Sequence, residues 1–331
     1  MKLKLCVIIL TGILAVASAY YFFNQNEEQN LTEDDIKTKI RSKDGMTMIY
    51  IPAGEFEMGS SFFESVVLTN GRLFLFPDQR PKHTVYLDAF WIDQTEVTVE
   101  MFRKFIEATG YKTSAEKEGW GKPWAEGPEE SEWPKTEGVD WLHPQNPESI
   151  AQDDHPVVQV SWEDAMAYCR WVGGRLPTEA QWEKAARGTD GRRFPWGDEF
   201  NGTYLNYGDQ RCPVERWRDT DYDDGYAYTS PVGSYPEGAS PYGVLDMAGN
   251  VWDWTYDWYD EDYYENSPNR NPMGPESGRV RSMRGGAWYD GEPEGWVNCV
   301  VRHQNPSNDR YEDVGFRCVL PADKIKSKII D

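Results

Sequence analysis

Residues 281–320 read RSMRGGAWYDGEPEGWVNCVVRHQNPSNDRYEDVGFRCVL, and this stretch decides the fold. A glycine-containing block, RGGAW at 284–288, opens it, and GFRC at 315–318 closes it. Aromatic and arginine residues lie between the two blocks, a mixture that recognition surfaces use and that buried structural aromatics also produce. The Asp and Glu residues at 290–294 are typical of a solvated surface. Taken alone, the stretch leaves both packing and binding open.

Length and composition limit the class of protein. The chain has 331 residues, enough for one large core or two modest ones, and contains 15 Trp and 19 Tyr. This composition favours loops held in place by large side chains. The net charge of −22 argues against nucleic acid as a partner, because binding to phosphates requires Lys and Arg. The acidic residues also offer many oxygen donors for calcium.

The N-terminus predicts export. Lys2 and Lys4 precede an apolar run from Leu5 to about Phe23. The small residues Ala17-Ser18-Ala19 fit cleavage of a signal peptide, whereas the length of the run also suits a membrane anchor through residues 5–23. Either way, the remainder is expected to be extracytoplasmic: periplasmic, secreted, or membrane-anchored and facing outward.

Composition then divides the chain into four parts. Residues 1–23 are the signal peptide or signal anchor, and residues 24–44 form a polar linker. A single folded domain follows over 45–321, and a polar tail over 322–331. No internal repeat is visible in the domain.

Local patterns predict short elements within the domain. Met48–Pro52 and Glu55–Gly59 are predicted to form a hairpin that turns at Ala53-Gly54, and strands are predicted over 83–87 and 90–92. Three helices are predicted from their N-caps, Thr98, Ser161 and Thr178. Residues 112–154 are predicted to form a long loop that tryptophans fasten to the core.

Six blocks of the chain, in order and spacing, resemble the formylglycine-generating enzymes (sulfatase-modifying factors). They cover 46–60, 81–105, 155–188, 194–200, 241–259 and 281–320. The combination of GGRLPTEAQWE at 173–183 with GNVWDW at 249–254 is highly specific. The resemblance implies a single α+β domain related to the C-type lectin fold, low in regular secondary structure and braced by calcium. A fold inferred in this way does not fix the activity.

The resemblance also implies two structural calcium sites. Asp246 and Asp253 lie seven residues apart around a glycine turn, and carboxylate and carbonyl oxygens suit this hard cation. The ligands implied for the first site are Asp246, Asp253 and the carbonyls of Gly249 and Val251. Those implied for the second are Asn206, Asp224 and the carbonyls of Tyr207 and Tyr226.

Four cysteines follow the leader, and spacing alone allows three pairings of them. The resemblance pairs Cys169 with Cys318. It leaves open whether Cys212 and Cys299 pair with each other or stay free and buried.

In the family, two cysteines after the GGS motif bind copper(I). Here the first position falls at Asp290 and the second near Glu294 or Gly295, while Ala287 replaces the serine. Carboxylates are poor copper(I) ligands, so copper chemistry is not expected. Asp290, Glu294 and His303 remain groove candidates for a different metal or a general base.

The competing interpretation is a binding protein. Some relatives of this frame present the final block as a recognition surface, which here corresponds to Trp288, Tyr289, Trp296, Arg302 and Gln304. The sequence therefore predicts an exported, calcium-braced protein with a degenerate copper site that recognises a peptide or protein or takes part in an envelope assembly. The alternative is a divergent extracytoplasmic oxidase, including one that generates formylglycine on sulfatases. Whether the protein is an enzyme stays open.

Overall fold

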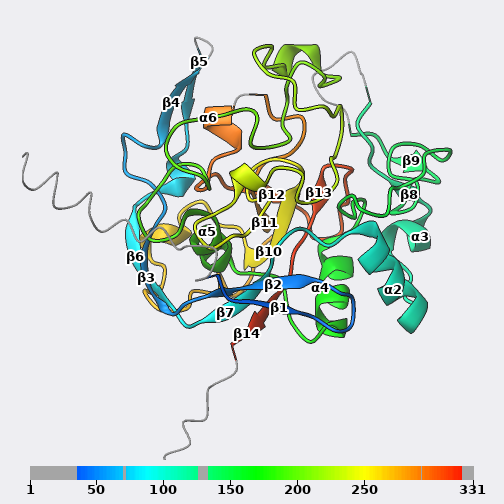
Figure 1. Ribbon diagram of the computed structural model, residues 1–331, viewed down its shortest axis with the longest axis horizontal. Coiled ribbons are helices and arrows are strands. Elements are labelled where there is room, and N and C mark those ends of the chain that lie inside the picture. The colour runs from blue at the N-terminus through cyan, green and yellow to red at the C-terminus, as the bar shows by residue number, and fades with distance from the viewer. Residues whose placement is uncertain (1–35, 70–71, 126–132, 292, 323–331) are drawn as a thin grey trace, which may run out of the picture. The chain divides into compact units, whose positions relative to one another are not determined.

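The computed structural model describes residues 36–69, 72–125, 133–291 and 293–322. In these ranges short helices and strands alternate with long irregular segments (Figure 1). The predicted α+β class with little regular secondary structure is confirmed. The helices are α2 (Val99–Thr109), α3 (Ser114–Glu118), α4 (Trp162–Trp171), α5 (Glu179–Arg187) and α6 (Pro293–Trp296), with 3-10 turns η3 (Pro77–Gln79), η4 (Glu215–Trp217), η5 (Pro236–Gly238) and η6 (Tyr263–Glu265).

The described strands form two four-stranded sheets and three two-stranded ones. One large sheet has the order β1-β2-β7-β14 and the other β12-β11-β10-β13, while β3-β6, β4-β5 and β8-β9 are the small sheets. The strands are β1 (Thr38–Ile40), β2 (Thr47–Ile51), β3 (Gly54–Met58), β4 (Val66–Thr69), β5 (Arg72–Leu75), β6 (His83–Leu87), β7 (Phe90–Asp93), β8 (Trp120–Gly121), β9 (Thr136–Glu137), β10 (Trp252–Trp258), β11 (Arg281–Arg284), β12 (His303–Asn305), β13 (Val314–Gly315) and β14 (Val319–Pro321).

The hairpin predicted over 48–59 is wrong, although both of its strands exist. β2 pairs with β7 and β3 pairs with β6, all antiparallel, with Ile51 opposite Phe90 and Gly54 opposite Leu87. The segments 47–58 and 83–93 therefore form one bent two-stranded ribbon, and the bend falls at Pro52-Ala53-Gly54. Gly54 has φ +149°, a conformation that other residues rarely adopt. Ala53-Gly54 therefore marks a bend in the ribbon and not the turn of a hairpin.

The linker predicted over 24–44 extends too far into the domain. β1 pairs with β2 at the edge of the first sheet. Beyond it Arg41 is buried, and its guanidinium contacts Asp44 (Nη2–Oδ2 2.6 Å) and Asp93 (Nη1–Oδ1 2.6 Å). A buried guanidinium held by two carboxylates ties residues 38–44 to the domain. The leader over 1–23 and most of the tail lie outside the described residues. No helix in the described ranges is long and apolar enough to cross a membrane.

The three helices predicted from their caps are confirmed. The hydroxyls of Thr98, Ser161 and Thr178 each accept a hydrogen bond from the backbone N–H three residues on, which opens α2, α4 and α5. The expected long loop over 112–154 contains one more helix, α3. Thr113 and Glu116 form a capping box there, a signal that is present in the sequence.

The disulfide implied between Cys169 and Cys318 is present, with the two Cα atoms 5.7 Å apart. It joins α4 to the segment before β14 inside the main core, which also contains Trp252 and Trp254 of β10. Cys212 and Cys299 are buried and form no disulfide with any described residue. The open question about this second pair is thereby answered in favour of free, buried thiols.

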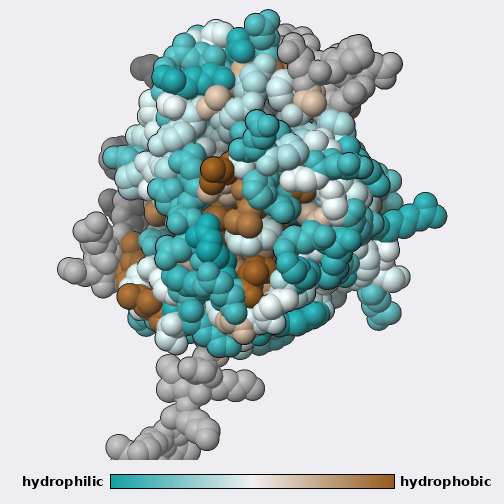
Figure 2. All heavy atoms as spheres, turned by 90° about the vertical axis from the view of Figure 1, so that its right-hand side faces the viewer, coloured by the Kyte–Doolittle hydropathy of each residue, from teal (hydrophilic) through white to brown (hydrophobic). Residues whose placement is uncertain are grey.

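The side of the domain with α2, α3, β8 and β9 faces the viewer in Figure 2. Hydrophilic residues cover most of this face, and hydrophobic areas between them are small (Figure 2). This distribution agrees with the net charge of −22, which keeps the surface solvated.

Candidate functional site

The site of interest is the turn that follows β11. Gly285 and Gly286 both have positive φ, and a Cβ on Gly286 would lie 2.7 Å from the carbonyl oxygen of Trp296. The chain can therefore pass only with glycine there. Next, the N–H of Asp290 donates to the Ala287 carbonyl (3.0 Å), and the N–H of Ala287 donates to Asp290 Oδ2 (2.8 Å). The family resemblance places the first cysteine at this position. Here Asp290 occupies it and stabilises the turn 287–290 through both hydrogen bonds.

Two more acidic side chains lie near Asp290. Asp313 and Glu312, which follow Tyr311 just before β13, are each 4 % exposed, and Asp290 is 8 % exposed. Burial raises the pKa of Asp313 to about 7 and raises the pKa values of Asp290 and Glu312 well above their usual range. The charge of Asp313 adds to the rise at both neighbours. The three carboxyl groups consequently favour their neutral forms unless a cation joins them.

His303, another groove candidate, does not complete a metal site with Asp290 among the described side chains. The ring of His303 on β12 packs 5.0 Å from that of Trp252 and 6.4 Å from that of Trp296, and burial lowers its pKa to about 4. Glu294 is the second residue of α6, and its side chain lies outside the described structure. In the ranges that the structure covers, no three His, Cys, Asp or Glu side chains are close enough together to hold a metal ion.

The recognition surface predicted in the last block is only partly accessible. Trp288 is 1 % exposed and Arg302 is 4 % exposed, so neither contacts a ligand at the surface, and the prediction is wrong for both. The buried ring of Trp288 packs 5.0 Å from that of Tyr228. Tyr289 and Trp296 are partly exposed, and Gln304 is exposed.

The structure adds aromatic residues that the sequence analysis did not connect to this turn. The rings of Trp133 and Trp217 pack 5.6 and 5.2 Å from that of Tyr289, and Trp133 also packs 5.6 Å from Tyr311. All four side chains are partly exposed. We call Trp133, Tyr289 and Tyr311 the aromatic wall; it stands beside Asp290, Glu312 and Asp313. Trp133 is one of the tryptophans of the long loop over 112–154. Nothing in the sequence links it to residues more than 150 positions away.

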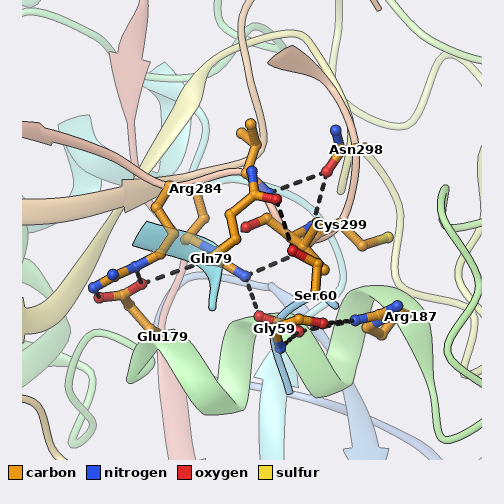
Figure 3. A network of polar contacts seen from close by, with 12 residues as sticks. Gly59, Ser60, Gln79, Glu179, Arg187, Arg284, Asn298 and Cys299 are labelled. Carbon is orange, nitrogen blue, oxygen red and sulfur yellow. Dashed lines mark hydrogen bonds and ion pairs between the residues drawn. The ribbon is translucent and has the colours of Figure 1, made fainter. Parts of the chain in front are cut away.

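Arg302 is buried because it belongs to a charged network on helix α5. It donates to Glu179 through Nε (2.8 Å) and Nη2 (3.0 Å), and Arg284 donates to Glu183 (2.5 Å) and to the carbonyl of Cys299 (3.0 Å). Figure 3 shows Glu179 and Arg187 at the two ends of this helix, with Arg284 reaching toward Glu179. Carboxylates and carbonyls accept from Arg302 and from both Nη groups of Arg284, which is how a buried charge is tolerated, while Nε of Arg284 has no partner among the described residues. The network is a support for β11 and the turn after it.

Of the donors implied for the first calcium site, the structure brings the carboxyl groups of Asp246 and Asp253 close to each other. Asp253 accepts from Trp182 Nε1 (2.8 Å) and Arg317 Nε (2.7 Å) through Oδ2, and its buried Oδ1 has no partner among the described residues. Burial raises the pKa of Asp246, and the charge of Asp253 adds to this rise. A Cβ on Gly249 would lie 2.1 Å from the Asn206 carbonyl oxygen, so the turn between them requires glycine. Val251 leads directly into β10.

One resident cation partly balances these acids. The guanidinium of Arg317 pairs with Asp253 and lies 3.8 Å from Glu96, whose Oε2 has no hydrogen-bond partner within the described part of the chain. Glu96, Asp246 and Asp253 are three carboxylates facing one guanidinium. These three carboxylates do not by themselves form a metal-binding cluster in the described ranges, so a divalent cation here would also need carbonyl oxygens such as those implied at Gly249 and Val251.

Three residues of the second implied set, Asp224, Tyr207 and Tyr226, lie close together. Asp224 accepts from the N–H groups of Tyr207 (2.9 Å) and Tyr226 (2.8 Å), which brings these three residues together. Asn206 is 1 % exposed; its amide nitrogen donates to Tyr228 O and Asn250 Oδ1, while its Oδ1 has no partner in the described ranges. Burial raises the pKa of Asp224 to about 7. The unpartnered Asn206 amide oxygen and the desolvated Asp224 carboxyl group are both oxygen donors of the kind that calcium binds.

Comparison with known proteins identifies the class. Residues 32–322 match the family model described as sulfatase-modifying factor enzyme 1-like domain, so the chain belongs to this family. A protein named formylglycine-generating enzyme from Streptomyces coelicolor is 37 % identical over 305 residues, covering 83 % of this chain and 89 % of that protein. A mouse protein named inactive C-alpha-formylglycine-generating enzyme 2 is 31 % identical over 300 residues, covering 85 % and 89 %. The solved structure of PvdO from Pseudomonas aeruginosa superimposes with a TM-score of 0.63 at 25 % identity, covering 86 % of this chain and 98 % of that one.

Proposed function

We propose that this chain is an extracytoplasmic member of the family that recognises a peptide or protein, or serves as a part of an envelope assembly, and that it has lost copper(I)-dependent oxidation. The observation that carries the proposal is the state of the turn after β11. Asp290 stands where the family has a copper-binding cysteine and is buried with its carboxyl group bonded to its own turn. Copper(I) prefers soft thiolates, and a carboxyl group held in this way is a poor substitute.

The remaining thiols do not replace the missing pair. Burial raises the pKa of Cys212 to about 11 and that of Cys299 to about 12, so both stay protonated at neutral pH. The carbonyl oxygen of Cys299 accepts a hydrogen bond from Arg284. Neither sulfur is therefore poised as a copper ligand.

The full chain should fail to make formylglycine. We would incubate it with copper(I), oxygen, a thiol reductant and a cysteine-bearing sulfatase-type peptide, and follow the peptide by mass spectrometry. The Streptomyces coelicolor relative, run in parallel, is the positive control. Because neither family cysteine is present, the expected result is unchanged peptide with this chain and aldehyde with the control. Aldehyde formed by this chain would overturn the proposal.

A divergent oxidase is the second candidate, and the 37 % identity to a formylglycine-generating enzyme favours it. The aldehyde assay decides between the two for this chemistry. The 31 % identity to a relative named inactive favours recognition, because it indicates that the fold is retained without the reaction.

Structural calcium is part of the proposal, and its removal should destabilise the domain. A cation that binds only the folded state, at about a hundred times its Kd, adds about 2.7 kcal/mol. For a domain of this size, chelation should then lower Tm by roughly 5–10 °C. The measurement is a thermal melt with calcium and with chelator.

A charge variant provides the control for that melt. Asp253→Asn should abolish most of the calcium-dependent shift, because the site loses one of its carboxylates. The exposed Asp262→Asn should keep the shift in full. If the Tm of the unaltered chain is the same with calcium and with chelator, the proposal of structural calcium is wrong.

A further inference from the structure

The aromatic wall stands beside three carboxyl groups that the structure leaves without a positive partner. In the described ranges, three carboxyl oxygens have no donor at hydrogen-bonding geometry: both oxygens of Glu312 and Oδ1 of Asp313. The backbone N–H of Trp124 lies near Glu312, where it opposes the effect of burial on the pKa. Within those ranges, no Lys or Arg pairs with either residue or with Asp290. Leaving three acidic groups buried without a counter-charge is costly.

A second, independent feature is an indole N–H buried next to this cluster. Trp252 is 1 % exposed, and its Nε1 faces Asp290 and Tyr289 but makes no hydrogen bond of good geometry with any described residue. Unpaired buried donors and acceptors side by side mark a place where a molecule is missing. Since the aromatic side chains next to them are partly exposed, such a molecule has access from solvent.

The chemistry of the surroundings selects an organic cation. Asp290, Glu312 and Asp313 do not form a metal-binding cluster, since no group of three metal-binding side chains is found in the described structure. A positively charged group, however, is attracted both to carboxylates and to the faces of Trp and Tyr rings. The chain contains its own example: the ammonium of Lys122 lies 4.6 Å from the centroid of Tyr311 and 2.7 Å from Asp309 Oδ2.

We infer that Trp133, Tyr289 and Tyr311, together with Asp290, Glu312 and Asp313, bind an alkylammonium group, such as the side chain of a lysine in a peptide. The inference rests on the proposed recognition function and names the chemistry that would be recognised. The net charge of −22 draws cations toward the protein and so favours encounter. The ligand occupies the place where catalytic relatives of this frame carry cysteine.

The test is a titration of the full chain with n-butylammonium, followed by calorimetry and by tryptophan fluorescence. Its uncharged counterpart, 1-butanol, and methylguanidinium are titrated in parallel. Saturable binding of butylammonium, with no binding of butanol and weaker binding of methylguanidinium, supports the inference. N-acetyl-lysine amide then separates two sources of the same group: tighter binding than butylammonium indicates a peptide, and equal binding indicates a free amine.

Variants show whether the ammonium binds at this place. Trp133→Leu and Glu312→Gln should each weaken binding about tenfold or more, because each removes a cation–π or charge contact. Trp196→Leu, a partly exposed Trp elsewhere, and the exposed Glu148→Gln should leave binding unchanged. Near-UV circular dichroism checks that each variant is folded; Trp133 is partly exposed, so its variant carries the test if the buried Glu312 variant unfolds.

Butylammonium that binds no better than butanol, or equally in all four variants, would overturn the inference, and stronger binding of methylguanidinium would overturn the choice of ammonium. These outcomes are independent of the aldehyde assay. Absence of both aldehyde and ammonium binding removes only this inference, whereas aldehyde formation removes the proposed function.

Discussion

Replacing Arg284 with methionine should destabilise the domain by about 3–5 kcal/mol, the range for breaking a buried ion pair from one side. Arg284 is fully buried, and its guanidinium meets Glu183 at 2.5 Å and Glu179 at 3.5 Å. Methionine fills much of the same space but supplies no donor. The Glu183 carboxylate would then keep only the contacts from Arg187 and the Gly59 N–H, both made through its other oxygen. The Glu183 oxygen that Arg284 contacted would remain buried without a donor, and this is the source of the loss.

Denaturant unfolding of the purified chain gives the free energy directly. Arg192→Met is the matched control: its ion pair with Asp190 is half exposed, and exposed pairs contribute about 1 kcal/mol or less. A second variant, Arg284→Met combined with Glu183→Gln, should recover part of the loss because the stranded charge is removed as well. If Arg284→Met cost no more than Arg192→Met, the network would not support β11 as described.

The disulfide is the second large effect. Cys169 and Cys318 are 149 residues apart, and cross-linking a loop of this length constrains the unfolded chain by about 4–5 kcal/mol in the loop-entropy model. Cys169→Ala should lower the free energy of unfolding by about that amount. The bond joins α4 to the end of the chain, so its loss also frees β14 to separate from β7.

Cys212→Ala controls for the loss of a buried sulfur without the loss of a cross-link, and about 1 kcal/mol is expected for it. The two variants are compared by urea unfolding without reductant. With reductant added, the unaltered chain should unfold like Cys169→Ala. Equal stability of the two variants would show that the cross-link contributes little.

Sequence patterns predicted best where the determinants are local. Thr98, Ser161 and Thr178 cap helices within one turn of themselves, so their neighbours suffice to find them. Strand pairing depends on distant partners. Residues 48–59 contain two genuine strands, the second of which starts at Gly54, but each pairs with a strand 25 to 45 positions away. The prediction of both strands is therefore confirmed, whereas the prediction that they pair with each other is wrong.

The same distinction applies to the candidate site. The family frame located the turn at Asp290, and the pairing of Cys169 with Cys318 followed from it. Exposure did not follow, because Trp288 and Arg302 have the composition of a binding surface and are buried all the same. The partners that bury Arg302 lie on α5, and Trp133 reaches Tyr289 from a separate loop. Only the folded chain reveals these neighbours.

Residues 314–321 set the order in which this domain can form its contacts. β14 supplies the last strand of the first sheet, β13 lies parallel to β10 in the second, and Cys318 is one partner of the disulfide. During synthesis, all three contacts can form only after residues 314–321 have emerged, since their partners were made much earlier. A nascent chain of 300 residues would thus carry two unfinished sheets and an unpaired Cys169. Premature termination or a frameshift near residue 310 would leave a product without either sheet edge closed, a ready substrate for proteases and chaperones.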